Sequence, residues 1–140
     1  MTKLPPRHVI TQRWLRNLRS GGFKQGILFL RDTSNRYCCL GVLCETINEL
    51  VPGYITSRPG SQHYIFYIND EDSEVATKPS ASFPPLVICK HMGLSSEDLA
   101  TISAWNDIKH CSFKWIAESL PKAFPQLLKE PKNDEPETTE

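Results

Sequence analysis

The sequence lacks a hydrophobic run of the roughly 18–20 residues needed to cross a bilayer. It also lacks an apolar segment after its charged start at residues 1–8, so we expect no signal peptide. Hydrophobic residues make up 39% of the 140 positions, which is enough for one core and too much for a wholly disordered chain. At about 100–200 residues per domain, this length predicts one domain. We therefore expect a soluble, cytoplasmic protein with a single core.

The chain has no excess of charge of either sign, because 16 basic residues stand against 16 acidic ones. The distribution is uneven, however. Residues 1–36 contain eight basic residues and one acid, a net charge of +7, so residues 37–140 carry −7. Such asymmetry favours an anionic partner. The alternative is that the two regions neutralise each other in the fold.

The five cysteines form no Cys-x-x-Cys pair of the kind typical of structural zinc, and their number is odd. We therefore expect reduced thiols, no disulfide framework, no metal and no cofactor. Cys38 and Cys39 precede a predicted helix whose N-terminus could lower a thiol pKa, which leaves a cysteine-dependent enzyme as an alternative. The simpler hypothesis is that Cys39 and Cys44 pack as small hydrophobes, so we expect no catalytic residue.

Hydrophobic periodicity predicts helices over residues 9–20, from about Gly41 to residue 50, over 86–92, and from Ser95 and Ser112 onward. Residues 54–68, with Pro59-Gly60 at their centre, predict a β-hairpin. The expected fold class is therefore α+β: a single compact, mostly helical domain over residues 1–128 with a small antiparallel hairpin sheet. Residues 129–140 contain no aromatic residue and predict a disordered acidic tail.

Two polar motifs have alternative interpretations. Asp70-x-Asp72-x-Glu74 imitates the start of a calcium loop, but Val75 stands where such a loop needs glycine, so we expect a solvated acidic loop. Asn106-Asp107 could bind a ligand. Such a pair more often closes a helix and starts a turn through hydrogen bonds to the backbone.

Four segments follow one another over most of residues 10–120: Arg19–Gly26, Leu30–Cys44 with its RYCCLGVLC core, Pro85–Leu94, and Trp105–Ala117. Together they resemble a family of small, uncharacterised proteins of bacteriophages and prophages. The resemblance implies a phage setting and an α-rich fold, and it implies no established biochemistry. This chain has His91 where the family usually has Trp. It has Trp115 where the family favours Glu, so the predicted cap at Ser112 loses its reciprocal hydrogen bond and Trp115 becomes a candidate to face a partner.

The candidate ligand- or partner-binding residues are the basic residues of the first third of the chain. Three of them follow at intervals of three on the first predicted helix and are expected to share an exposed face. Arginine forks match the geometry of phosphates and carboxylates. Ordinary solubilising charge is the alternative. The six residues are Arg13, Arg16, Arg19, Lys24, Arg31 and Arg36.

We therefore predict a non-catalytic, phage-type accessory protein that acts by binding. The expected role is a counter-defence factor that blocks a host defence protein or sequesters the nucleotide signal that the defence system uses. One alternative is a nucleic-acid-binding protein that uses the basic N-terminal helix, and its binding would weaken steeply with salt. The other is the cysteine-dependent enzyme, in which one thiol would react unusually fast.

Overall fold

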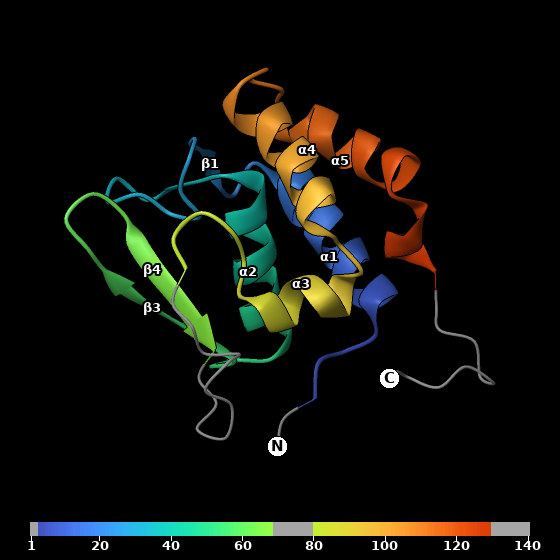
Figure 1. Ribbon diagram of the computed structural model, residues 1–140, viewed down its shortest axis with the longest axis horizontal. Helices are drawn as coiled ribbons and strands as arrows, with labels where there is room; N and C mark the ends of the chain where they lie inside the picture. Colours follow the sequence, from blue (N-terminus) through green and yellow to red (C-terminus); the bar gives the residue numbers. More distant parts are fainter. Residues whose placement is uncertain (1–2, 69–79, 130–140) are drawn as a thin grey trace.

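The computed structural model describes residues 3–68 and 80–129 (Figure 1). The helices gather on one side of the molecule, and a hairpin projects from the other (Figure 1). The acidic motif at residues 70–74 and all but the first residue of the predicted acidic tail lie outside the described residues. The elements in chain order are α1 (Arg7–Ser20), β1 (Lys24–Gln25), β2 (Arg36–Tyr37), α2 (Cys39–Leu50), β3 (Ile55–Pro59), β4 (Tyr64–Ile68), α3 (Leu86–Met92), α4 (Ser96–Asp107), α5 (Phe113–Ala123) and the 3-10 helix η1 (Pro125–Leu128).

The predicted α+β class is confirmed, with five α-helices and two small two-stranded sheets in the described segments. Strands β3 and β4 form the expected antiparallel hairpin, with Ile55 opposite Ile68 and Pro59 opposite Tyr64. Strands β1 and β2 form a second, parallel pair that the sequence pattern does not reveal. None of the helices in residues 3–68 and 80–129 is both long and apolar enough to cross a membrane.

Helix α1 begins two residues earlier than predicted. The carbonyl of Pro6 accepts hydrogen bonds from the N–H groups of Val9 and Ile10, so the first turn already forms at Arg7. The helix ends at Gly21, whose φ of 79° lies in the left-handed region that favours glycine. Its buried face packs against α2 and α5 and consists of Ile10, Thr11, Trp14, Leu15 and Leu18.

Helix α2 begins directly after the extended residue Cys38, whose carbonyl accepts from the N–H groups of Gly41 and Val42. Its far end is tied to the hairpin by Asn48. The side-chain amide of Asn48 donates to the carbonyl of Ile55 at 2.9 Å and accepts from the N–H of Ile55 at 2.8 Å. The distinctive segment around Arg36–Cys44 therefore supplies β2 and the first half of α2.

Helices α4 and α5 begin next to the serines that the sequence predicts as their starts. Ser95 and Asp98 form a reciprocal capping box at the start of α4. Ser112 accepts from the N–H of Trp115 without a return bond, as expected from the missing glutamate. Helix α5 continues through Pro121 to Ala123, although this proline has no N–H to donate to the carbonyl four residues earlier; the adjacent Leu120 is fully buried.

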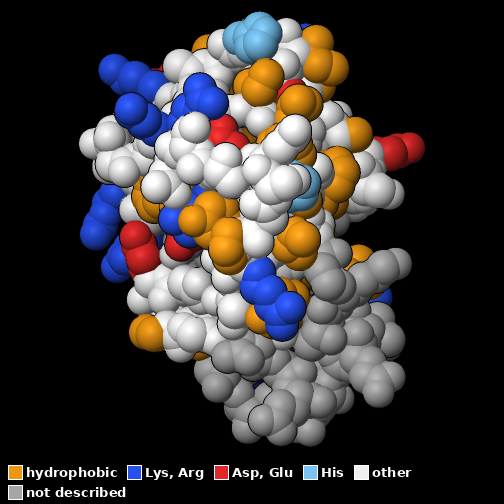
Figure 2. Space-filling model, turned by 90° about the vertical axis from the view of Figure 1, so that its left-hand side faces the viewer, with side chains coloured by type: hydrophobic (Ala, Val, Ile, Leu, Met, Phe, Trp, Pro, Cys, Tyr) orange, Lys and Arg blue, Asp and Glu red, His pale blue; other side chains and the backbone are white. Residues whose placement is uncertain are grey.

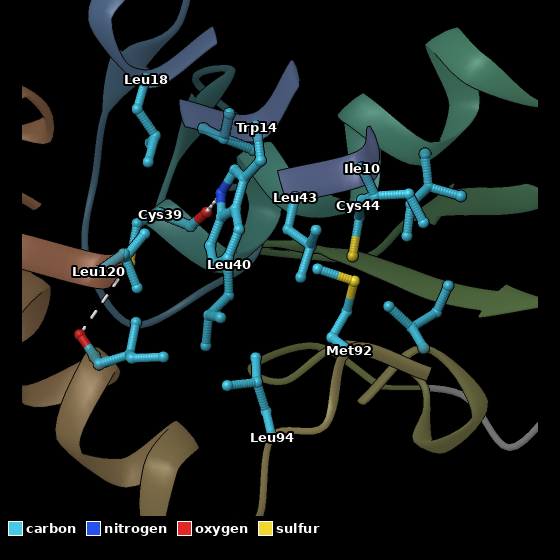
Figure 3. Packing of buried hydrophobic residues seen from close by; sticks show 14 of the residues in the cluster. Ile10, Trp14, Leu18, Cys39, Leu40, Leu43, Cys44, Met92, Leu94 and Leu120 are labelled. Carbon is cyan, nitrogen blue, oxygen red and sulfur yellow. Dashed lines mark hydrogen bonds between the residues drawn. The ribbon is translucent and has the colours of Figure 1, made fainter. Parts of the chain in front are cut away.

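The core lies between α1, α2 and the C-terminal helices. Trp14 is fully buried at its centre, and its indole Nε1 donates to the carbonyl of Cys39 at 3.0 Å (Figure 3). Cys39 and Cys44 are fully buried among apolar side chains, and in Figure 3 the sulfur of Cys44 lies beside that of Met92. The prediction that Cys39 and Cys44 pack as small hydrophobes is confirmed.

Candidate partner-binding surface

Arg13 of α1 forms an ion pair with Glu49 of α2. Its Nη1 lies 3.1 Å from Oε1 of Glu49. The same oxygen accepts from Nδ2 of Asn17 at 3.0 Å, and that nitrogen also donates to the hydroxyl of Thr46 at 2.9 Å. Arg13 therefore neutralises an acid of the neighbouring helix, in line with the alternative that the two oppositely charged regions compensate each other.

Arg31 is held between aromatic rings. Its guanidinium lies 4.0 Å from the ring centroid of Tyr64 and 5.7 Å from that of Tyr37. Its Nε and Nη2 both donate to Oδ1 of Asn35, at 3.0 and 2.7 Å. Burial raises the pKa of the carboxyl group of Glu45, and the positive charge of Arg31 opposes this rise. Arg31 thus stabilises the packing of the hairpin residue Tyr64 against the segment from Arg31 to Tyr37.

Arg36 is paired within its own turn, because its Nε lies 3.1 Å from Oδ2 of Asp32. Burial alone would raise the pKa of Asp32. The hydrogen bonds from the backbone N–H groups of Arg36 and Ser34, together with the charge of Arg36, lower it below its usual value instead. This pair stabilises the turn between Asp32 and Arg36.

The remaining three predicted residues, Arg16, Arg19 and Lys24, are exposed. Within the described segments their side chains have no hydrogen bond, ion pair or ring contact. The structure thus divides the six candidates: three have side-chain partners in the fold, although Arg36 is itself exposed, and three are exposed without such partners. Lys24 and Arg36 are neighbours in the parallel β1/β2 pair, and the participation of all six residues in one site stays a prediction.

The cysteines at the start of α2 do not have the environment of a reactive thiol. Burial raises the pKa of Cys38 to about 12, and the backbone hydrogen bonds around the helix start lower it only in part. Burial also raises the pKa values of Cys39 and Cys44 well above the usual range and that of Cys89 to about 11. The shift at Cys38 is therefore opposite to the one that a helix N-terminus would produce. The described residues contain no group of three or more His, Cys, Asp or Glu side chains suited to a metal ion.

A buried polar network, which the sequence analysis missed, joins β1 to the end of α4. Asn106 is 1% exposed. Its Oδ1 accepts from Nε2 of Gln25 at 2.9 Å, and its Nδ2 donates to the carbonyl of Gly26 and to Oδ1 of Asp107, both at 2.8 Å. Oδ1 of Asp107 also accepts from the N–H of Leu28 at 3.0 Å. The Asn106-Asp107 pair stands at the end of α4 as predicted, but its side chains bond a loop some 80 residues away and not the local backbone.

Exposed aliphatic side chains stand on the two segments that this network joins. Ile27 is 43% exposed, Leu28 55% and Ile108 73%. In Figure 2, hydrophobic side chains gather on the upper part of the visible face below a histidine, and Lys and Arg side chains lie at its left edge. In the sequence, these three residues are apolar but lie outside the apolar faces of the predicted helices, which is the one sign that they could be exposed. Single exposed aliphatic residues are common, so that signal alone is weak.

Comparisons with known proteins place the chain in a family and give no function. Neither the curated proteins nor the solved structures contain a match. A family described as a domain of unknown function (DUF8296) matches residues 7–123, which include all five α-helices and both sheets of the described structure. The chain therefore belongs to this uncharacterised family, DUF8296.

Proposed function

We propose that this protein acts by binding, without catalysis, and that its partner is a protein with an anionic surface. The observation that carries the proposal is the exposure of Arg16, Arg19 and Lys24 without internal partners, while Arg13 and Arg31 are engaged in the fold. Helix α1 is anchored on its other side by the fully buried Trp14. Arg16 and Arg19 are thus presented by a fixed helix, which lowers the entropic cost of binding.

We extend the proposal to counter-defence: the partner is a host defence protein that this chain blocks. This step rests on the resemblance of the RYCCLGVLC segment and its companions to phage and prophage proteins. A nucleotide signal or a nucleic acid could bind the same three basic side chains, so the experiments below include both as alternative partners. The aromatic and carboxylate partners of Arg31 and Arg36 favour the protein partner, because they leave fewer guanidinium groups to enclose a phosphate.

The test is a restriction assay in bacteria that carry single defence systems and express the protein. We expect wild-type protein to restore plaque formation against at least one system. The double variant Arg16→Glu/Arg19→Glu should reduce this rescue tenfold or more, roughly the loss of one charge-assisted hydrogen bond. A matched control is Lys122→Glu/Lys129→Glu, which makes the same charge change at exposed positions elsewhere. Rescue lost equally in both variants, or no rescue in any system, would refute the proposal.

Binding by purified protein separates the three kinds of partner. The defence protein that is neutralised in the assay, cyclic and linear nucleotides, and duplex DNA are titrated at 50 and 200 mM salt. We expect saturable binding to the defence protein alone. Affinity for DNA that falls by orders of magnitude between the two salt concentrations would identify the nucleic-acid-binding alternative. Tight nucleotide binding with a shallow salt dependence would identify signal sequestration.

A further inference from the structure

We propose that Ile27, Leu28 and Ile108 form a docking surface, here the 27/108 surface, for an acidic protein segment that carries large apolar side chains. The surface lies on the loop after β1 and at the end of α4. It is separate from the arginines of α1 and does not depend on them. The proposal rests on a strained loop conformation, on the network that fixes it, and on the charges around it.

Leu28 adopts a backbone conformation that its own side chain disfavours. The N–H of Phe29 donates to the carbonyl of Ile27 at 2.9 Å, which closes a three-residue γ-turn, and Leu28 at its centre has a φ of 75°. This form of the γ-turn is rare and strained. Strain of this kind is acceptable where it buries a side chain, yet Leu28 is more than half exposed. Strained residues concentrate at functional sites, and the turn presents Ile27 and Leu28 to solvent.

The surrounding structure holds this turn in place. The N–H of Leu28 is bonded to Asp107, and the carbonyl of Gly26 to the buried Asn106. On the other side the carbonyl of Phe29 accepts from the N–H of Cys38 at 3.2 Å, and the N–H of Leu30 donates to the carbonyl of residue 81 at 2.8 Å. Ile108 directly follows Asp107, so one hydrogen bond links the two halves of the surface. A surface fixed before binding loses little conformational entropy on docking.

The charges around the three aliphatic side chains favour an acidic partner. Lys24, Lys109 and Lys114 are exposed on the flanking segments. Asp107 lies on the same segments, and its Oδ1 already accepts two hydrogen bonds. A protein segment fits better than a nucleic acid, because bases stack on aromatic rings and guanidinium planes while aliphatic side chains pack against apolar residues. The occupant is therefore an acidic segment with apolar anchors.

The experiment selects random 16-residue peptides on immobilised full-length protein and measures how the consensus peptide binds to variants. We expect enrichment of Asp and Glu together with large apolar residues. Ile108→Ala and Leu28→Gly should each weaken the consensus peptide tenfold or more. The matched control is Leu86→Ala on α3, a similarly exposed leucine (51%), which should change the affinity less than twofold. Lys109→Glu/Lys114→Glu should weaken binding and reduce its salt dependence.

The fold of each variant is checked by melting temperature and by near-ultraviolet circular dichroism of the aromatic side chains. Because Leu28→Gly relieves strain, it tests the surface without the risk of unfolding. The proposal is overturned if the selected peptides show no acidic excess, or if Leu86→Ala is as harmful as Ile108→Ala. It is also overturned if the surface proves to be a contact between two copies of the chain, seen as dimerisation that Ile108→Ala abolishes. Loss of binding in Arg16→Glu/Arg19→Glu alone would support the α1 face and reject the 27/108 surface.

Discussion

The α-carbon of Gly41 lies directly against the backbone carbonyl of Leu30. A Cβ atom at position 41 would come within 1.8 Å of that oxygen, far inside any van der Waals contact. Helix α2 and the loop before β2 therefore touch through their backbones, and only glycine permits this approach. The glycine of the RYCCLGVLC segment is explained by packing.

Gly41→Ala should consequently destabilise the protein by more than about 3 kcal/mol, because neither backbone can move away without disturbing the core. The measurement is urea unfolding followed by tryptophan fluorescence. Gly22→Ala is the control: its Cβ would meet the hydroxyl oxygen of Ser20 at 3.3 Å, and we expect a change within about 1 kcal/mol. Equal stability of the two variants would contradict the close approach of Gly41 to Leu30.

Replacing Asn106 by alanine should cost about 1–3 kcal/mol, because the half-buried carbonyl of Gly26 loses its donor and the amide of Gln25 keeps only the carbonyl of Cys111. Asp107→Asn keeps an oxygen acceptor for the N–H of Leu28 and should cost less than about 1 kcal/mol. Differential scanning calorimetry compares the two. A small loss in Asn106→Ala would show that the bonds of this network contribute little to stability.

Leu28→Gly should stabilise the protein by about 0.5–1 kcal/mol. The relief of the left-handed conformation outweighs the greater entropy that glycine loses on folding. The neighbouring Ile27→Gly has no such strain to relieve and should be neutral or destabilising. Chemical denaturation measures both, and a destabilised Leu28→Gly would mean that the Leu28 side chain contributes to the core.

Stability should fall as the pH rises above about 9. Burial raises the pKa of Cys38 to about 12 and that of Cys89 to about 11, so the native state keeps these protons after the unfolded chain has lost them. Stability is complete below the unfolded thiol pKa of about 8.5 and is lost as the pH approaches the folded values. Each thiol contributes a slope of about 1.4 kcal/mol per pH unit in this window.

In the Cys38→Ala variant, the free energy of unfolding should fall less steeply between pH 9.5 and 11, by about 1.4 kcal/mol per pH unit. Unfolding at a series of pH values measures this difference. In native protein, iodoacetamide should modify the less buried Cys111 before Cys38. Rapid alkylation of Cys38 near neutral pH would instead revive the hypothesis of a cysteine-dependent enzyme.

The sequence predicts the local features of this fold well. The ends of α1 and α3 before Gly21 and Gly93, the start of α4 after Ser95 and the hairpin turn at Pro59-Gly60 all depend on neighbouring residues, so a pattern along the chain reveals them. Pro121 does not end α5, although it has no N–H to donate to the carbonyl four residues earlier.

The candidate site was less predictable because its contacts cross long sequence distances. Arg13 meets Glu49 across 36 residues, and Asn106 meets Gln25 across 81. Helical spacing can place Arg13, Arg16 and Arg19 on one face, but it does not show that an acid of α2 neutralises the first of them. The exposure of Leu28 and Ile108 likewise depends on how the two loops are joined.

The double hydrogen bond from Asn48 to Ile55 also determines how the hairpin meets its surroundings. In β3, the residues whose backbone N–H and C=O groups point away from β4 are every second one: Ile55, Ser57 and Pro59. The side-chain amide of Asn48 is bonded to both the N–H and the C=O of Ile55. Pro59 has no N–H. Of the three, Ser57 alone therefore has a backbone N–H that could pair with a further strand. One such donor is a poor template for strand addition. The β3 edge of the hairpin is thereby protected against edge-to-edge aggregation.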